Sequence, residues 1–472
     1  MGGSAGIALA EDVAAARRAL AADYRQKLDE LAVWCEAQGQ NDLARHTRQW
    51  FVERDPTRLY FFDPPASMAE DEPADPHAEA FTQWQTKFRA LRTAQANSLF
   101  TLARRAIKQH RPSLTSELVL ETVRENPDHE HARLLLGFVK HDNVWRTPFE
   151  VRQLNDGKVR HEQFGWLRKA HVERYDRGER FYLGRWVTAD AEVRLRADIA
   201  RAWRVESDHY VVMTNHSLEE GVRLSRRLER LYLVWKTAFP RYLASEPELA
   251  RRFDGRSPLG RDPRRHNVTY FRSRGEYNQA LRAKQPQIDI TLGLYLDPVK
   301  TVYFFADKEQ DPGTVYHEAT HQLFQETQPV SRTVGERDNF WIIEAIACYM
   351  ESLEEHPGYC TLGGFEAART PAARVRLLVD NFYVPLAELV GYSRQHVQHD
   401  PSILKLYSQA AGMAAFLMQY GEGQYREPLA EYLVRVYTGR VDRDTLAQLT
   451  GSSYAELDHQ YRQFLESAGK LE

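Results

Sequence analysis

The first third of the chain carries apolar residues at helical spacing. Between residues 12 and 38 they recur every three to four positions, which predicts one face of an amphipathic helix, and a shorter helix follows. Residues 56–77 are rich in Pro, Asp and Glu and predict a linker or an exposed loop. Residues 78–109 and 114–138 then predict a helical hairpin. We therefore expect residues 1–142 to form a helical N-terminal region.

A different pattern begins at Trp145. Short runs of aromatic and β-branched residues alternate there with Gly and Asp, which is typical of short strands. Residues 143–204 therefore predict a small β-rich unit. Residues 205–214 predict one further strand, and residues 218–239 predict a long amphipathic helix.

The following segment alternates between strands and helices. Strands are predicted at residues 268–272, 288–296 and 301–305, and a short helix at residues 276–283. A longer helix opens at Asp311-Pro312, because Asp is a good N-cap and Pro fits the first helical position. The remainder reads mostly as helix, including residues 339–355. The pattern thus predicts an α+β fold in which residues 205–472 form one domain, with a small mixed sheet and a helical C-terminal subdomain.

Composition narrows the class of protein. The chain has 472 residues, 63 Lys and Arg against 66 Asp and Glu, and a net charge of −3. A protein that binds mainly nucleic acid needs a strong basic excess, so we expect no nucleic-acid partner. No apolar run reaches the roughly 18 residues of a membrane span, so we expect no transmembrane segment. Three cysteines exclude a disulfide framework.

The N-terminus leaves the compartment open. Residues 1–10 lack the basic and apolar regions of an intact signal peptide. Ala8-Leu9-Ala10 does resemble the small-residue end of a cleavage site, so a truncated secretory precursor stays an alternative to the start of an Ala-rich helix. We make no prediction of localisation.

Candidate chemistry lies in the helix that opens at Asp311, which contains His317-Glu318-Ala319-Thr320-His321. Two His four positions apart project from one face of a helix, where both imidazoles can reach a single Zn²⁺. Glu318 lies beside them and fits a general base for a metal-activated water. The alternative is a solvated helix with two incidental His.

A third protein ligand is expected from a second helix. Glu344 is the charged residue of an otherwise apolar stretch, Trp341 to Met350. Burying a carboxylate there is costly unless it is paired or binds a metal. Two His, one Glu and water form a common catalytic zinc set. The alternative for Glu344 is an exposed helix carboxylate.

These residues resemble the gluzincin clan of zinc metallopeptidases. Residues 205–440 are also similar to a bacterial family of gluzincin-like proteins of unknown function, through four matching segments. These are Thr214–Glu219, Thr291–Tyr295, His317–Leu323 and Glu344–Glu351. The resemblance implies a zincin-like catalytic domain that binds Zn²⁺ through His317, His321 and Glu344, with Glu318 as the general base.

Two departures from the clan concern specificity and ligand orientation. The exopeptidase motif Gly-x-Met-Glu-Asn is absent, so aminopeptidase specificity does not follow. Many gluzincins place an Asp four residues after the ligand Glu to orient the first His, whereas this chain has Cys348 there. Glu351, on the same helix face as Glu344, is the candidate for that orienting role, although it could also be a solvated charge.

The resemblance also implies a downstream Tyr or His that stabilises the oxyanion. We assign this to Tyr407, in a helix of small residues, with a core-packing tyrosine as the alternative. The expected function is hydrolysis of peptide bonds in a peptide or protein substrate. Two alternatives stay open: a zinc-binding scaffold with little turnover, with the N-terminal helices recruiting a protein partner, and a hydrolase of non-peptide amides.

Overall fold

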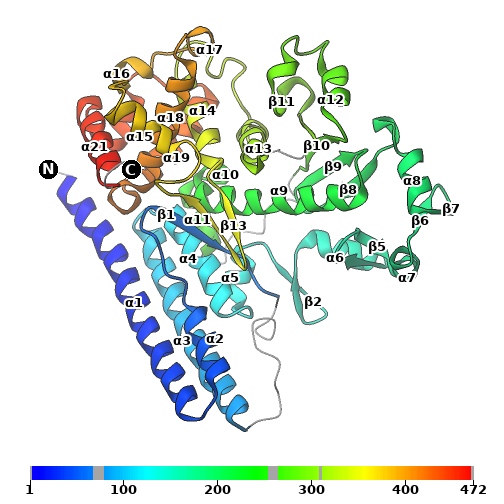
Figure 1. Ribbon diagram of the computed structural model, residues 1–472. Coiled ribbons are helices and arrows are strands. Elements are labelled where there is room, and N and C mark those ends of the chain that lie inside the picture. Colours follow the sequence, from blue (N-terminus) through cyan, green and yellow to red (C-terminus); the bar gives the residue numbers. More distant parts are fainter. Residues whose placement is uncertain (1–2, 67–78, 254–263, 308–310, 469–472) are drawn as a thin grey trace.

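The protein is mostly helical, with several small sheets (Figure 1). The computed structural model describes residues 3–66, 79–253, 264–307 and 311–468. Helices and sheets alternate along the chain, so the predicted mixed α and β composition is confirmed. None of the helices among these residues is long and apolar enough to cross a lipid bilayer.

The N-terminal helices lie side by side at the lower left of Figure 1. They are α1 (Gly3–Ala37), α2 (Asn41–Trp50), α3 (Glu79–Lys108), α4 (Pro112–Glu125) and α5 (Glu130–Leu135). Trp84 and Phe88 stack in the core that α1, α2 and α3 share. Pro112 occupies the first turn of α4, where its missing N–H costs nothing. The predicted helical hairpin is confirmed, but its second arm is interrupted after Glu125 and continues as the separate short helix α5.

The expected loop at residues 56–77 is wrong in its first part. Strand β1 (Arg58–Phe62) is mostly buried and pairs antiparallel with β14 (Tyr359–Gly363), which pairs with β13 (Glu354–His356). The apolar run Leu59–Phe62 explains the strand, since both of its faces are covered. Residues 67–78 lie outside the described residues. Through its pairing with β14, strand β1 connects the N-terminal helices to the C-terminal half of the chain.

The segment that follows is built from three successive hairpins, each with a short helix after it. The first has β2 (Val139–His141), β3 (Val144–Arg146) and α6 (Pro148–Asn155); the second has β4 (Lys158–His161), β5 (Gly165–Arg168) and α7 (Val172–Asp176); the third has β6 (Glu179–Tyr182), β7 (Arg185–Thr188) and α8 (Ala189–Leu195). The second strand of each carries a Trp: Trp145, Trp166 and Trp186. The expected short strands are present, but they form a repeated ββα unit that the sequence reasoning missed.

A five-stranded sheet follows, with the order β11-β12-β10-β9-β8. Its strands are β8 (Trp203–Glu206), β9 (Tyr210–Thr214), β10 (His266–Phe271), β11 (Leu294–Leu296) and β12 (Thr301–Phe305). Strands β9, β10 and β12 are parallel, while the two edge strands β8 and β11 are antiparallel to their neighbours. The single strand predicted at residues 205–214 is therefore a hairpin. The strand predicted at 288–296 is limited to β11, because Ile288–Ile290 form a 3-10 helix and the residues between the two are a loop.

Helix α9 (Leu218–Ala238) packs on this sheet and begins at Ser217, whose hydroxyl accepts a hydrogen bond from the Glu220 N–H. Shorter helices α10 (Pro240–Leu243), α11 (Glu246–Phe253) and α12 (Arg274–Leu281) complete this part. Helix α13 (Pro312–Glu326) and helix α14 (Phe340–Met350) follow. The helix predicted to run to residue 355 therefore ends earlier, because β13 begins at Glu354.

The C-terminal helices follow. They are α15 (Thr370–Leu378), α16 (Leu386–Leu389), α17 (Arg394–His399), α18 (Ile403–Gly423), α19 (Arg426–Thr438), α20 (Thr445–Thr450) and α21 (Tyr454–Glu466). Of these, α18 packs along α14. Helix α18 passes close to α15 at Gly412, where a Cβ atom would stand 2.6 Å from the Cβ of Ala373. All three cysteines are free thiols and buried.

Candidate metal centre

Helix α13 presents the two His of the HExxH sequence to one cavity. The Asp311 carboxylate accepts a hydrogen bond of 2.9 Å from the Gly313 N–H and fixes the start of the helix. His317 and His321 are one turn apart, and their Nε2 atoms are 3.1 Å from each other. Both rings therefore turn the same nitrogen toward the same point.

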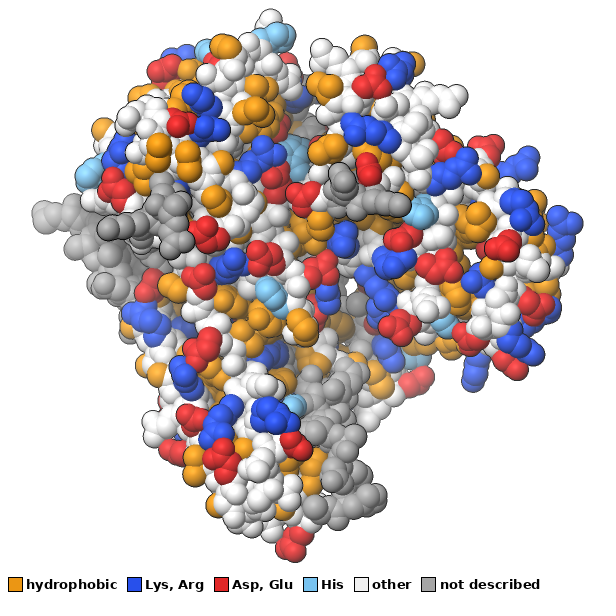
Figure 2. Space-filling view, in the orientation of Figure 1, with side chains coloured by type: hydrophobic (Ala, Val, Ile, Leu, Met, Phe, Trp, Pro, Cys, Tyr) orange, Lys and Arg blue, Asp and Glu red, His pale blue; other side chains and the backbone are white. Residues whose placement is uncertain are grey.

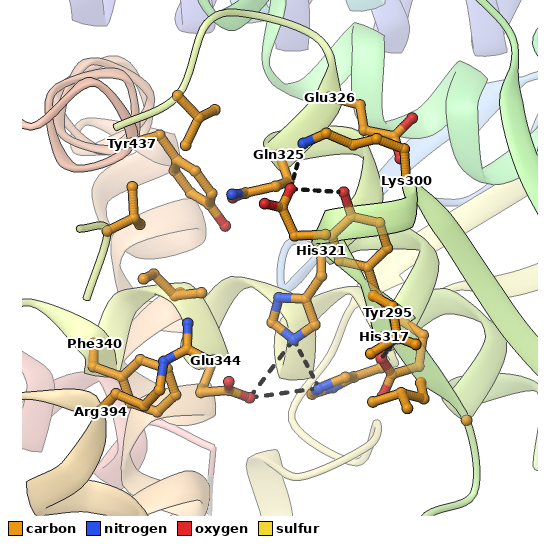
Figure 3. Close-up of a pocket in the computed structure, with 18 of the residues that line it drawn as sticks. Tyr295, Lys300, His317, His321, Gln325, Glu326, Phe340, Glu344, Arg394 and Tyr437 are labelled. Atoms are coloured by element: carbon orange, nitrogen blue, oxygen red, sulfur yellow. Dashed lines mark hydrogen bonds and ion pairs between the residues drawn. The ribbon is translucent and has the colours of Figure 1, made fainter. Parts of the chain in front are cut away.

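Glu344 meets this pair from helix α14. Its Oε2 lies 3.5 Å from His317 Nε2 and 3.7 Å from His321 Nε2, as the dashed lines in Figure 3 show. A tetrahedral Zn²⁺ with bonds of about 2.0–2.1 Å separates its ligand atoms by about 3.3 Å. The three distances observed lie close to that value, so these residues fit a zinc ion.

The electrostatics of the group agree with its geometry. Burial disfavours the ionised Glu344, but the charges and hydrogen bonds of His321 and His317 outweigh it and lower the pKa of that carboxyl well below its usual range. Burial likewise opposes the charged His317, whereas its hydrogen bonds with Cys348, Glu344 and Glu351 raise its pKa. The carboxylate in the apolar helix α14 is thus paired, as its burial requires.

Glu351 holds the other side of the His317 ring. Its Oε1 lies 2.8 Å from His317 Nδ1, and the guanidinium of Arg369 donates two hydrogen bonds of 2.8 and 2.9 Å to the same carboxylate. In the neutral ring, a proton on Nδ1 leaves the Nε2 lone pair of His317 facing Glu344. Arg369 was not singled out from the sequence, because it lies in a loop and only the fold brings it to Glu351.

Cys348 also lies next to the ring, with Sγ 4.0 Å from His317 Nδ1. Burial raises the pKa of this thiol. A neutral thiol accepts a hydrogen bond weakly, and Glu351 is much closer to the same nitrogen. The carboxylate therefore occupies the orienting position, and Cys348 fills space beside it.

Glu318 lies on the sheet side of the cavity. Its Oε2 accepts a hydrogen bond of 2.9 Å from the backbone N–H of Tyr295, in the edge strand β11. Gly293 permits this approach, since a Cβ atom there would stand 3.0 Å from Glu318 Cγ and 3.2 Å from the Phe304 ring. Neither contact was foreseen from the sequence, although Gly293 was part of a matching segment.

Tyr407 stands on the opposite side, on α18. It lines the same cavity, and the Arg369 guanidinium lies 5.9 Å from the centre of its ring. Burial and the negative charge of Glu344 raise the pKa of Tyr407, so its hydroxyl keeps its proton. A protonated hydroxyl can donate to a developing oxyanion.

The cavity itself measures about 1300 Å³ and is open to solvent on one side. His317, Glu318, His321, Glu344 and Tyr407 all line it. Figure 3 shows the two His and Glu344 converging at its base, with Tyr295 and Lys300 on one wall and Arg394 on the other. Every residue predicted for the site except Cys348 therefore borders one space, together with Arg369.

A second pair of His, on α17, is set apart from this centre. His396 stacks on Tyr392 with ring centres 3.8 Å apart, and His399 Nδ1 bonds the carbonyl of Gln395. Both contacts are local to the helix end, and neither residue lines the cavity.

Comparison with known proteins adds no family to this picture. Neither the profiles of known protein families nor the sequences of curated proteins match the chain.

Proposed function

We propose that the protein is a zinc-dependent hydrolase of peptide bonds with a zincin-like catalytic domain of the gluzincin type. The proposal rests on one observation, the three separations of 3.1, 3.5 and 3.7 Å among His317 Nε2, His321 Nε2 and Glu344 Oε2. The similarity of the surrounding sequence to gluzincins supports it. A cavity that is large enough for an extended chain segment and open on one side suits a peptide substrate.

When bound by these three residues, Zn²⁺ lowers the pKa of water and polarises a carbonyl group. Glu318 then acts as the general base: its carboxylate takes the proton of the attacking water and later delivers that proton to the leaving amine. The bond from the Tyr295 N–H holds this carboxylate at the wall of the cavity. Tyr407, protonated and on the opposite wall, donates to the oxyanion as it forms.

The pair formed by Arg369 and Glu351 positions the first ligand. The two hydrogen bonds from Arg369 fix the carboxylate, and the carboxylate fixes the tautomer and plane of the His317 ring. This arrangement takes over the function that an Asp at position 348 would perform.

The proposal is tested by removing the metal and restoring it. The purified protein is stripped with a chelator, and cleavage of a mixed-peptide pool is followed by mass spectrometry before and after zinc is returned. We expect cleavage to disappear and then return. His317→Ala should abolish both zinc binding and cleavage, while His396→Ala, in the set-apart pair on α17, should keep both. Cleavage that is unaffected by chelation would refute the proposal.

A zinc-binding scaffold with little turnover is the second candidate. The observation in its favour is that one carboxylate oxygen of Glu318 already accepts a hydrogen bond from the Tyr295 N–H. Stoichiometric zinc binding without cleavage of any peptide in the pool would establish this alternative.

A further inference from the structure

Large apolar side chains are exposed around the mouth of the cavity. Ile290 is 78% exposed, Leu292 53%, Val299 43% and Leu404 74%. Leu292 and Leu404 line the cavity, and the other two lie next in sequence to Thr291 and Pro298, which also line it. Exposed apolar groups cluster at binding sites, because a partner that covers them removes apolar surface from water and so lowers the free energy.

The two lining leucines stand on opposite walls. Leu292 directly precedes Gly293, the residue packed against Glu318. Leu404 lies one helical turn before Tyr407 on α18. Figure 2 shows apolar side chains on both sides of the hollow between the C-terminal helices and the segment around β11. A chain segment that lies across the metal centre therefore meets an apolar side chain on each side.

Three basic side chains of the same walls form ion pairs within the protein, while Arg264 and Arg332 also line the cavity. Lys300 forms an ion pair with Asp297, Arg369 with Glu351 at 2.8 Å, and Arg394 with Glu336 at 3.1 Å. All six of these residues line the cavity. Paired charges offer little to a charged substrate, whereas the exposed leucines lose unfavourable contact with water when a substrate covers them.

We propose that Leu292 and Leu404 determine specificity, and that the site takes extended peptide segments with large apolar side chains beside the scissile bond. This inference rests on the proposed function. Each leucine covers one such side chain, one toward the sheet and the other toward α18. The contact removes apolar surface of both partners from water.

The first test measures binding without turnover. Glu318→Gln protein, loaded with zinc, is titrated into a short fluorescein-labelled peptide with Leu at alternate positions and Gly between, and into a matched peptide with Ser in place of Leu. We expect the Leu peptide to bind about tenfold more tightly, and Leu404→Ser or Leu292→Ser to remove most of that preference. Leu183→Ser is the control, since Leu183 is 86% exposed at the tip of the β6–β7 hairpin and does not line the cavity.

The second test reads the cleaved bonds of a mixed-peptide pool by mass spectrometry. Wild type should favour bonds with Leu, Ile or Phe beside them, and Leu404→Ser should lose that preference while still cleaving. Cleavage with no apolar preference would overturn the specificity and leave the proposed function standing. No cleavage of any peptide by zinc-loaded wild type would overturn the proposed function instead, and the binding preference would then decide the role of the leucines by itself.

A second copy of the chain is the other occupant to exclude. If light scattering shows a concentration-dependent dimer that Leu404→Ser abolishes and Leu183→Ser keeps, the leucines serve self-association and the specificity proposal is overturned. We expect the same molar mass for wild type and both variants.

Discussion

His317 Nδ1 lies 2.8 Å from Glu351 Oε1, on the side of the ring away from Glu344. The ring is thus held between two carboxylates, Glu344 on helix α14 and Glu351 at the C-cap of that helix. One of them, Glu351, is itself held by two bonds from Arg369. This relationship fixes the orientation of the His317 ring, which is the first of the three proposed zinc ligands.

Replacing Glu351 should weaken zinc binding. Glu351→Gln keeps the size of the side chain but removes the charge that fixes His317, and loss of such an orienting partner typically costs 10–100-fold in metal affinity. Competition with a chromophoric chelator measures the change. Glu366→Gln is the matched control, since the Glu366 side chain is 77% exposed and its nearest cationic partner is 3.7 Å away. Equal affinities in both variants would contradict the orienting role.

Adding a methyl group at Gly293 should impair turnover and leave the metal in place. The Cβ of Gly293→Ala would press on Glu318 Cγ and the Phe304 ring, and would move the base away from the Tyr295 N–H. We expect kcat to fall about tenfold or more, as displacement of a catalytic group by a fraction of an ångström to 1 Å commonly does. Zinc content is measured in parallel. Gly275→Ala is the control, because its Cβ would meet nothing closer than 4.0 Å. A normal rate in Gly293→Ala would show that the close contact between Gly293 and Glu318 is not needed for turnover.

Removing the hydroxyl of Tyr407 should act on the chemical step. A donor to an oxyanion contributes mainly in the transition state, so Tyr407→Phe should lower kcat by about 10²–10³ and change KM little. Steady-state kinetics separate the two. Tyr359→Phe, in strand β14 and stacked against Tyr60, should behave as wild type. If KM rises while kcat is unchanged, Tyr407 binds substrate and does not stabilise the oxyanion.

Acid should destabilise the packing of the N-terminal helices, because it protonates the Glu121 carboxylate. Burial opposes its ionisation, but the charges of Arg17 and Arg54 lower its pKa to about 2, from an ordinary value of 4.5. Folding therefore stabilises the carboxylate, and this contribution is full above about pH 4.5 and is lost as the pH falls toward 2. A shift of this size corresponds to about 3 kcal/mol at most.

Urea unfolding followed by circular dichroism tests this linkage. Between pH 6 and pH 3 the midpoint should fall further for wild type than for Glu121→Gln, which has no proton to gain. If the midpoint falls by the same amount in the two proteins, the ion pairs of Glu121 do not contribute to the pH dependence of stability.

The sequence predicted the parts of the site that are local in the chain. The spacing of His317 and His321 and the cap at Asp311 are properties of one helix, and Glu344 stood out as a charge in an apolar stretch. Arg369 and the Tyr295 N–H were missed because long-range packing alone brings them to Glu351 and Glu318. The same limit applies to the fold.

Long-range pairing also explains the errors in the fold. Residues 58–62 were predicted as loop because Pro and Asp surround them, yet their apolar run pairs with β14 some 300 positions away in the chain. The ββα units at residues 139–195 were missed for another reason. Their common features are a Trp in each second strand and a Gly before each hairpin, which are too sparse to be noticed without the fold.

The most direct test of the central claim compares Glu318→Gln with wild type at equal zinc. Glu318 is not among the three proposed ligands, so the variant should bind about one zinc per chain, as wild type does. The rate of peptide cleavage per bound zinc should fall by about 10²–10⁴, because the general base is gone. Equal rates in the two proteins, or no zinc in either, would contradict the account.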